Sequence, residues 1–181
     1  MRRLLLLVLV LLLVAAALNA ERIGRHYYPF HYQEMIFHYA HQHSLDPYLL
    51  AALIKTESNF RSAAESPKGA LGLMQIMPNT GRWIADQLGE EEFDPAVLTD
   101  PESNLMLGSW YLAQLFDEFN DDPILALAAY NGGRGNVQAW LREERWTGEA
   151  KNLEQIPFPE TRQFVRKVLL NYRIYNFLYR N

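Results

Sequence analysis

The sequence predicts one all-α domain behind an N-terminal export segment. Apolar residues recur at spacings of three and four in successive segments, and no stretch alternates apolar and polar residues long enough for a sheet. The 181 residues fit one domain, since compact domains commonly contain roughly 100–200 residues. A core of this size is stable without disulfides or metals, and the chain contains no Cys. We therefore expect helices packed around one hydrophobic core.

The first 20 residues are typical of a secretory signal. Met1-Arg2-Arg3 precedes an unbroken apolar run of 15 residues, and Asn19-Ala20 follows that run. This pattern matches a signal peptide, whereas crossing a bilayer takes about 20 apolar residues. We predict a signal peptide at 1–20, with a short inner-membrane anchor as the alternative, and a linker at 21–29. The domain at 30–181 is then expected outside the cytoplasm.

Asp-Pro pairs mark helix starts along the rest of the chain, at residues 46–47, 100–101 and 122–123. Asp suits the N-cap because its carboxylate accepts free backbone N–H groups, and Pro suits the first helical position because its missing N–H is not needed there. Pro78 opens another helix, and apolar stripes support two longer ones, after Pro101 and after Pro159. The predicted helices are 31–43, 47–58, 78–88, 101–119, 123–131, 134–144 and 159–179.

Charge and composition exclude several function classes. Lys and Arg number 17 against 21 acidic residues, a net charge of −4, so a nucleic-acid partner is not expected. The lack of Cys excludes a Cys nucleophile and Cys-ligated metals. His38 and His41 are spaced to share a helix face as metal ligands, but no carboxylate motif accompanies them. Solvated or ring-stacked histidines are therefore favoured, and no metal site is predicted.

One carboxylate occupies a position where a core residue is expected. In the helix over 47–58 the apolar face runs through Leu50, Leu53 and Ile54, and Glu57 is the next position in the same series. Burial and the negative end of the helix both disfavour its charged form, so we expect a raised pKa for Glu57. A carboxyl group that keeps its proton near neutral pH can act as a general acid. A frayed helix end with Glu57 in water is the alternative.

Two further segments supply polar side chains between apolar neighbours. Gln75 is the one polar side chain in residues 71–78, and it is either a core amide bonded to backbone or a cleft group for sugars or amides. Tyr130 and Asn131 lie at a helix end before Gly132-Gly133, where side chains can reach a cleft.

Four motifs then occur in order: Glu57-Ser58, Gly72-Leu-Met-Gln-Ile-Met-Pro78, Ala129-Tyr-Asn-Gly-Gly133 and Phe158-Pro-Glu-Thr-Arg162. Together they resemble the successive motifs of the soluble lytic transglycosylase catalytic domain, which has a goose-type-lysozyme-like helical fold. The resemblance covers roughly residues 30–181 and implies that Glu57 is the single catalytic acid/base. It also implies a glycan cleft lined by Ser58, Ser66, Met74, Gln75, Tyr130, Asn131 and Glu160.

The resemblance implies a peptidoglycan lytic transglycosylase that cleaves the β-1,4 bond between N-acetylmuramic acid and N-acetylglucosamine. Its products would be 1,6-anhydromuramic ends, and no cofactor is needed. Peptidoglycan glycan strands are then the main partner, with envelope assembly machinery as a further candidate. We expect a monomer that contacts the membrane only through an uncleaved N-terminal segment.

Two alternatives stay open at this point. One is a lysozyme-type hydrolase on the same fold, in which a second carboxylate activates water. The other is a non-catalytic glycan-binding protein of the envelope. The sequence also departs from the family pattern twice: Phe164 stands where Tyr is frequent, and Gly81 stands where a better helix former is usual, at a cost of about 1 kcal/mol in helix propensity.

Overall fold

The computed structural model is a helical domain, and it describes residues 1, 2, 4, 6, 8–11, 14, 19–90 and 92–180. Within these residues there are helices and isolated bridges but no β-strand, which confirms the all-α prediction. The α-helices are α2 (Ala20–Tyr27), α3 (Gln33–Gln42), α4 (Pro47–Glu57), α5 (Pro78–Leu88), α6 (Pro101–Glu118), α7 (Pro123–Gly132), α8 (Arg134–Arg142) and α9 (Pro159–Tyr179). Two 3₁₀ helices, η1 (Pro95–Thr99) and η2 (Ala150–Gln155), complete the set. All seven predicted helices are present, with ends within two residues of the prediction.

The Asp-Pro pairs begin helices as predicted. Asp46 accepts hydrogen bonds from the backbone N–H groups of Tyr48 and Leu49 at the start of α4. Asp100 and Asp122 cap α6 and α7 in the same way. A fourth pair, Asp94-Pro95, starts η1, and the sequence analysis did not identify it. Local capping chemistry therefore fixes where these elements begin.

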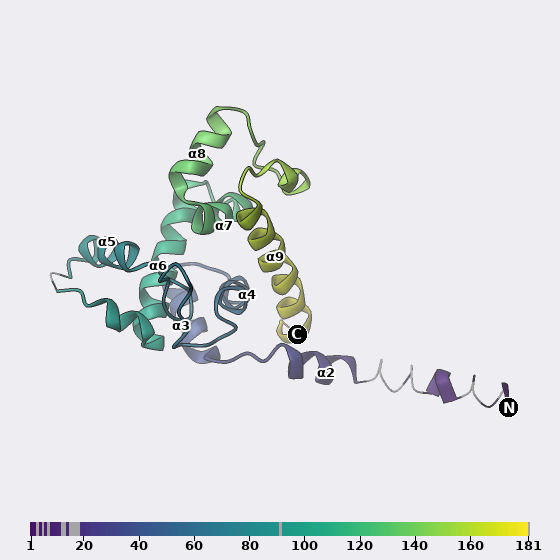
Figure 1. Ribbon diagram of the computed structural model, residues 1–181. Coiled ribbons are helices and arrows are strands. Elements are labelled where there is room, and N and C mark those ends of the chain that lie inside the picture. Colours follow the sequence, from purple (N-terminus) through teal and green to yellow (C-terminus); the bar gives the residue numbers. More distant parts are fainter. Residues whose placement is uncertain are drawn as a thin grey trace.

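The core lies around α4, which packs most extensively against α9. Leu50, Leu53 and Ile54 of α4 are completely buried, and Val165 and Val168 of α9 are completely buried as well. Helix α3 packs on α4 and α6, while α7 contacts α6, α8 and α9. Figure 1 shows α5 and η1 on one side of this core, and α7 and α8 on another. The C-terminal end of α4 therefore lies among α7, α9 and the loop that follows α4.

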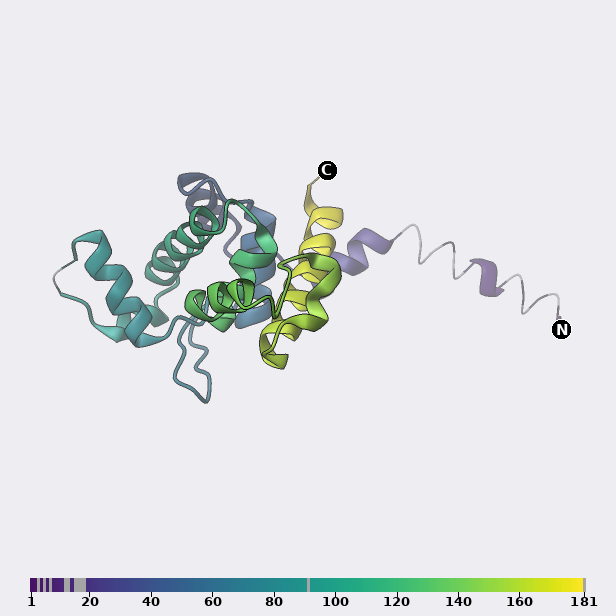
Figure 2. The same cartoon turned by 90° about the horizontal axis from the view of Figure 1, so that it is seen from above.

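Helix α2 covers residues 21–27 of the segment predicted as a linker, so this part of the segment is helical and packs on the domain. Its Arg25 donates a hydrogen bond to the Leu178 carbonyl at the end of α9 (3.1 Å) and lies over the Tyr179 ring. Gly24 lies against Leu178 so closely that an added Cβ would be 2.6 Å from that side chain. Both views show α2 beside the end of α9 (Figures 1 and 2).

Nine of the 20 residues of the predicted signal peptide lie outside the described residues. No helix among the described residues is long and apolar enough to cross a membrane.

The loop between α4 and α5 projects from the helices, as Figure 2 shows. A buried amide on α6, Asn104, holds the inner part of this loop. Its oxygen accepts from the Met74 N–H (2.8 Å), and its nitrogen donates to the carbonyls of Leu71 (3.0 Å) and Leu98 (2.8 Å). Gly72 makes this approach possible, because it has φ +79° and a Cβ there would be 2.3 Å from the Asn104 amide. The loop backbone is thus fixed next to the end of α4.

Candidate active site

Glu57 is the last residue of α4, and its side chain is partly buried. Burial, followed by the negative charge of Glu160, raises the pKa of Glu57 from its ordinary value of 4.5 to about 8. The direction agrees with the prediction, and burial is the main cause, as expected. The charge of Glu160 is a second cause, which the sequence did not indicate. At neutral pH this carboxyl group holds its proton and can donate it.

Tyr130 lies beside Glu57 and is oriented by the loop. Its hydroxyl donates a hydrogen bond to the Met74 carbonyl (2.7 Å). Burial, followed by the charges of Glu57 and Tyr111, raises the pKa of Tyr130 well above its usual range. The Phe164 ring stacks on the Tyr130 ring with centroids 6.4 Å apart and planes 9° apart. The phenol therefore stays neutral and fixed, and Phe164 supports it by packing.

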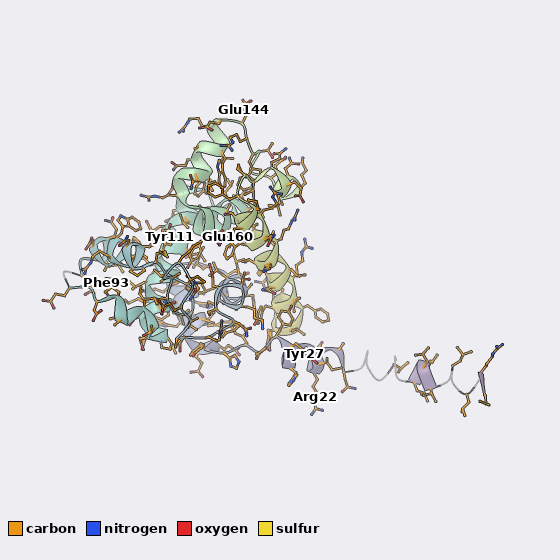
Figure 3. The ribbon with its side chains drawn as sticks, in the orientation of Figure 1. Arg22, Tyr27, Phe93, Tyr111, Glu144 and Glu160 are labelled. Carbon is orange, nitrogen blue, oxygen red and sulfur yellow. The ribbon has the colours of Figure 1, made fainter. Side chains whose placement is uncertain are left out.

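A cleft of about 460 Å³ opens over Glu57. Six of the eight residues that the resemblance places in the glycan site line it: Glu57, Ser66, Gln75, Tyr130, Asn131 and Glu160. These come from α4, the projecting loop, the end of α7 and the start of α9. Figure 3 labels Glu160 at the start of α9, between the helices drawn above and below it.

The other two predicted residues, Ser58 and Met74, do not line the cleft. Ser58 is only 2% exposed, and its hydroxyl donates to the Leu73 carbonyl (2.7 Å), so it ties the end of α4 to the loop. Met74 is completely buried and packs on Gly108, where an added Cβ would lie 2.4 Å from its sulfur. Met74 contributes only its carbonyl, which holds Tyr130. Met77 supplies the methionine of the cleft.

Some of the polar groups that line the cleft already form hydrogen bonds within the protein. The Gln75 amide nitrogen donates to the carbonyls of Ala64 (3.1 Å) and Gly72 (3.0 Å), which also holds Gln75 in a left-handed conformation (φ +51°). Its two N–H groups are therefore engaged, and its oxygen is the group that it can offer to a ligand. Asn131 accepts from the Thr161 hydroxyl (2.8 Å), so its amide nitrogen is the group that can donate to a ligand.

The sequence model described as Transglycosylase SLT domain matches residues 34–153. The chain belongs to this family. It is similar to the soluble lytic murein transglycosylase of Salmonella typhimurium, with 34% identity over 144 residues, covering 78% of this chain and 22% of that protein. It is also similar to the membrane-bound lytic murein transglycosylase C of Edwardsiella ictaluri, with 28% identity over 76% of this chain and 44% of that protein.

Solved structures show the same fold. The 70 kDa soluble lytic transglycosylase Slt70 of Escherichia coli superposes with a TM-score of 0.79 and 32% identity, over 85% of this chain and 25% of Slt70. An inactive mutant of the lytic transglycosylase Slt from Pseudomonas aeruginosa gives a TM-score of 0.74 and 35% identity, over 83% of this chain and 24% of that chain. The present chain thus spans about a quarter or less of these soluble relatives.

In this SLT domain Lys68 and Met77 also line the cleft. The sequence did not indicate either residue. Lys68 lies in the projecting loop and forms an ion pair with Glu160 across the cleft (2.8 Å). Both side chains are at least 70% exposed, so the pair is open to solvent. Nothing in the local sequence singles out Lys68, because its partner is 92 residues away.

The histidines lie apart from this cleft. His31 contacts the Phe60 ring (centroids 5.7 Å apart), and His41 contacts Phe37 (6.1 Å), as the stacking interpretation predicts. Among the residues that the structure describes, no group of three His, Asp or Glu side chains is placed to hold a metal ion.

Proposed function

We propose that this SLT domain cleaves the β-1,4 bond between N-acetylmuramic acid and N-acetylglucosamine in peptidoglycan, as a lytic transglycosylase. The observation that carries the proposal is the position of the Glu57 carboxyl group at the base of a polar cleft, where burial and then the charge of Glu160 raise its pKa to about 8. Membership of the SLT family supports the same reaction. In Slt of Pseudomonas aeruginosa, replacement of a glutamate by glutamine gives an inactive mutant, which agrees with a reaction that depends on one carboxyl group.

In the first step Glu57 donates its proton to the glycosidic oxygen as the C1–O bond breaks. The 2-acetamido oxygen of the muramic ring bonds to the same C1 and compensates the positive charge that develops there. The leaving N-acetylglucosamine departs with a free 4-hydroxyl, and Glu57 becomes a carboxylate. Because the pKa of Glu57 is high, its carboxylate is a strong base for the next step.

In the second step the Glu57 carboxylate takes the proton of the C6 hydroxyl of the muramic ring. The C6 oxygen bonds to C1 and displaces the acetamido oxygen, which closes the 1,6-anhydro ring and regenerates the Glu57 carboxyl group. The C6 hydroxyl is tethered to the reacting ring, and such tethering gives effective molarities of ~10⁵–10⁸ M. Water at roughly 55 M competes poorly unless a second carboxylate positions it.

The remaining cleft residues bind and orient the glycan in this proposal. The Gln75 oxygen and the Asn131 amide nitrogen supply one acceptor and one donor for the acetamido and hydroxyl groups. Ser66 and Glu160 contribute further polar contacts at the mouth of the cleft. Tyr130, fixed by the Met74 carbonyl, holds the wall next to Glu57 and limits the movement of the carboxyl group.

The lysozyme-type alternative has one observation in its favour, which is that Glu160 lies in the same cleft as Glu57. Its carboxylate pairs with Lys68 and is largely exposed, which suits a binding role better than water activation. Mass spectrometry of products from purified peptidoglycan separates the two reactions. A transglycosylase gives anhydromuramic ends, lighter by one water than hydrolysis products. Reducible muramic ends as the main product would refute the proposal in favour of hydrolysis.

We also propose that the domain acts outside the cytoplasm, in the periplasm, as a monomer. The basic start and the apolar run of residues 4–18 support export. N-terminal sequencing of the envelope protein tests cleavage after Ala20, and Met1 retained in the membrane fraction would indicate an anchor. Light scattering of the purified protein tests the monomer.

A further inference from the structure

The cleft over Glu57 continues into a longer groove. A second hollow of about 310 Å³ shares Gln75, Met77, Tyr130 and Asn131 with the cleft. A third hollow of about 280 Å³ shares Thr80 and Tyr111 with the second and is also lined by Asn79, Trp83 and Arg134. The groove therefore runs from Glu57 past Tyr111 to Arg134 at the start of α8. Figure 3 labels Tyr111, which belongs to α6 and lines both the second and the third hollow.

Aromatic rings line the groove along its length. The Tyr130 ring is 5.7 Å from Tyr111, and Tyr111 is 6.0 Å from Trp83, measured between centroids. Rings of this kind offer flat apolar faces with polar edges, which suit the mixed apolar and polar surface of a saccharide. A glycan strand bound at Glu57 thus has a continuous path toward the third hollow.

The end of the groove differs from the rest because it holds a cation. The Arg134 guanidinium lies over the Trp83 ring, 5.1 Å from the centroid, so it covers the ring face that a sugar would need. Its ion pair with Glu118 is 3.7 Å long, which is beyond the 2.7–2.9 Å typical of charge-assisted hydrogen bonds. Arg134 is half exposed, and a carboxylate arriving from the groove can therefore bind its free edge.

On the basis of the proposed function, we propose that this end of the groove binds the acidic stem peptide that the muramic units carry. Arg134 binds a peptide carboxylate, and the Asn79 and Thr80 side chains bond to peptide amides. In a peptide-bearing strand the lactyl carboxyl group of each muramic unit is blocked as the amide to the peptide, so the sugars themselves offer no carboxylate. The stem peptide has free carboxylates, and it extends sideways from a strand that lies along the aromatic rings.

Binding measurements test this proposal without relying on cleavage. The chain with Glu57→Gln is titrated calorimetrically with two tetrasaccharide fragments of peptidoglycan, one with its stem peptides and one stripped of them whose lactyl carboxyl groups are capped as methyl amides. Adding Arg134→Gln is expected to weaken binding of the peptide-bearing fragment about fivefold to tenfold, the range for losing one partly exposed charge-assisted bond, and to leave the stripped fragment unchanged. Adding Glu118→Gln is expected to tighten binding of the peptide-bearing fragment, because it removes the carboxylate that competes for Arg134.

Arg142→Gln is the matched control, since Arg142 is an exposed arginine of the same helix that lies outside the groove. The proposal is overturned if Arg134→Gln weakens both fragments equally, or neither, or no more than Arg142→Gln does. These results are independent of the proposed reaction. Wild-type protein that yields no anhydromuramic products from either substrate refutes the function, whatever the binding data show.

Discussion

Replacing Glu57 by glutamine should make the protein more stable at neutral and alkaline pH, while it abolishes cleavage. The side chain is partly buried, and burial, followed by the charge of Glu160, raises its pKa from 4.5 to about 8. Below pH 4.5 both the folded and the unfolded chain keep the Glu57 proton, so there is no difference between them. Between pH 4.5 and pH 8 the unfolded chain ionises while the folded chain does not, and the free energy of unfolding falls as pH rises.

The size of this effect follows from the two pKa values. One pKa unit corresponds to about 1.36 kcal/mol, so the change from 4.5 to about 8 lowers the free energy of unfolding by about 4–5 kcal/mol at pH 8 and above. The Glu57→Gln variant does not titrate and avoids this loss. Its stability should equal that of the wild type near pH 4 and exceed it by an amount that grows through pH 8. The amide has nearly the same shape, so packing changes contribute little.

Urea unfolding of both proteins at pH 4, 6, 7 and 8.5 measures the difference. Glu90→Gln, at an exposed glutamate, is the control, and its difference from the wild type should not vary with pH. Parallel stability curves for wild type and Glu57→Gln would refute the reasoning. They would mean that Glu57 ionises as easily in the folded protein as in the unfolded chain. A general acid with a high pKa would then be excluded.

Two further predictions concern the surroundings of Glu57. Glu160→Gln should lower the pKa of Glu57, and Lys68→Met should raise it, each by about half a pH unit, because Glu160 disfavours ionisation of Glu57 and Lys68 offsets the Glu160 charge. The alkaline limb of kcat/KM should move accordingly, and an unmoved limb in both variants would contradict this coupling. Asn104→Ala should lower the free energy of unfolding by about 3 kcal/mol, since two hydrogen bonds to the loop and one to η1 are lost and buried backbone groups stay unpaired. Urea unfolding measures that loss, Gln114→Ala on the exposed side of α6 is the control, and a loss no larger than the control's would show that Asn104 does not hold the loop.

The helices could be predicted because their signals are local. Asp46 and Asp122 cap within three residues of their own positions, and the apolar stripes repeat within each helix. Helix α2 was missed because Gly24 and Pro29 are typical of a linker. Gly24 is instead a contact point, where the absence of a side chain lets Leu178 approach from 154 residues away. A tertiary contact of this kind leaves no periodic pattern in the sequence.

The position of Glu57 could also be predicted, because a polar residue in an apolar series marks a buried polar group. The same rule applied to α6 would have identified Asn104, which lies next to Leu105 on the buried side of that helix. The loop residues could not be assigned in this way. Whether Met74 or Met77 faces the cleft depends on the left-handed backbone at Gln75 and on the space over Gly108. Neither feature produces a periodic pattern of apolar residues in the sequence.

Gly81 lowers the helix propensity of α5, but the packing of the domain requires a glycine at this position. Its helix propensity alone suggests a loss of about 1 kcal/mol relative to alanine. In the structure a Cβ at this position would lie 2.6 Å from the Phe93 ring and 3.2 Å from Leu98. Leu98 is completely buried, and its carbonyl is one of the groups that Asn104 binds. Because Gly81 has no side chain, η1 can pack closely against α5. In this position the Leu98 carbonyl of η1 is within reach of Asn104, which also binds the loop.

This arrangement explains how the domain can keep a proton on Glu57 without losing the shape of the cleft. The burial that holds the proton also weakens the fold as pH rises, so the residues around Glu57 have to be stabilised by other contacts. Ser58 binds the Leu73 carbonyl, Asn104 binds the Met74 N–H, and Tyr130 binds the Met74 carbonyl. The end of α4 and the helices α6 and α7 are thereby joined to two adjacent loop residues, Leu73 and Met74. Because these backbone groups are satisfied within the protein, the cleft offers a substrate only a few polar atoms, and each has a fixed direction.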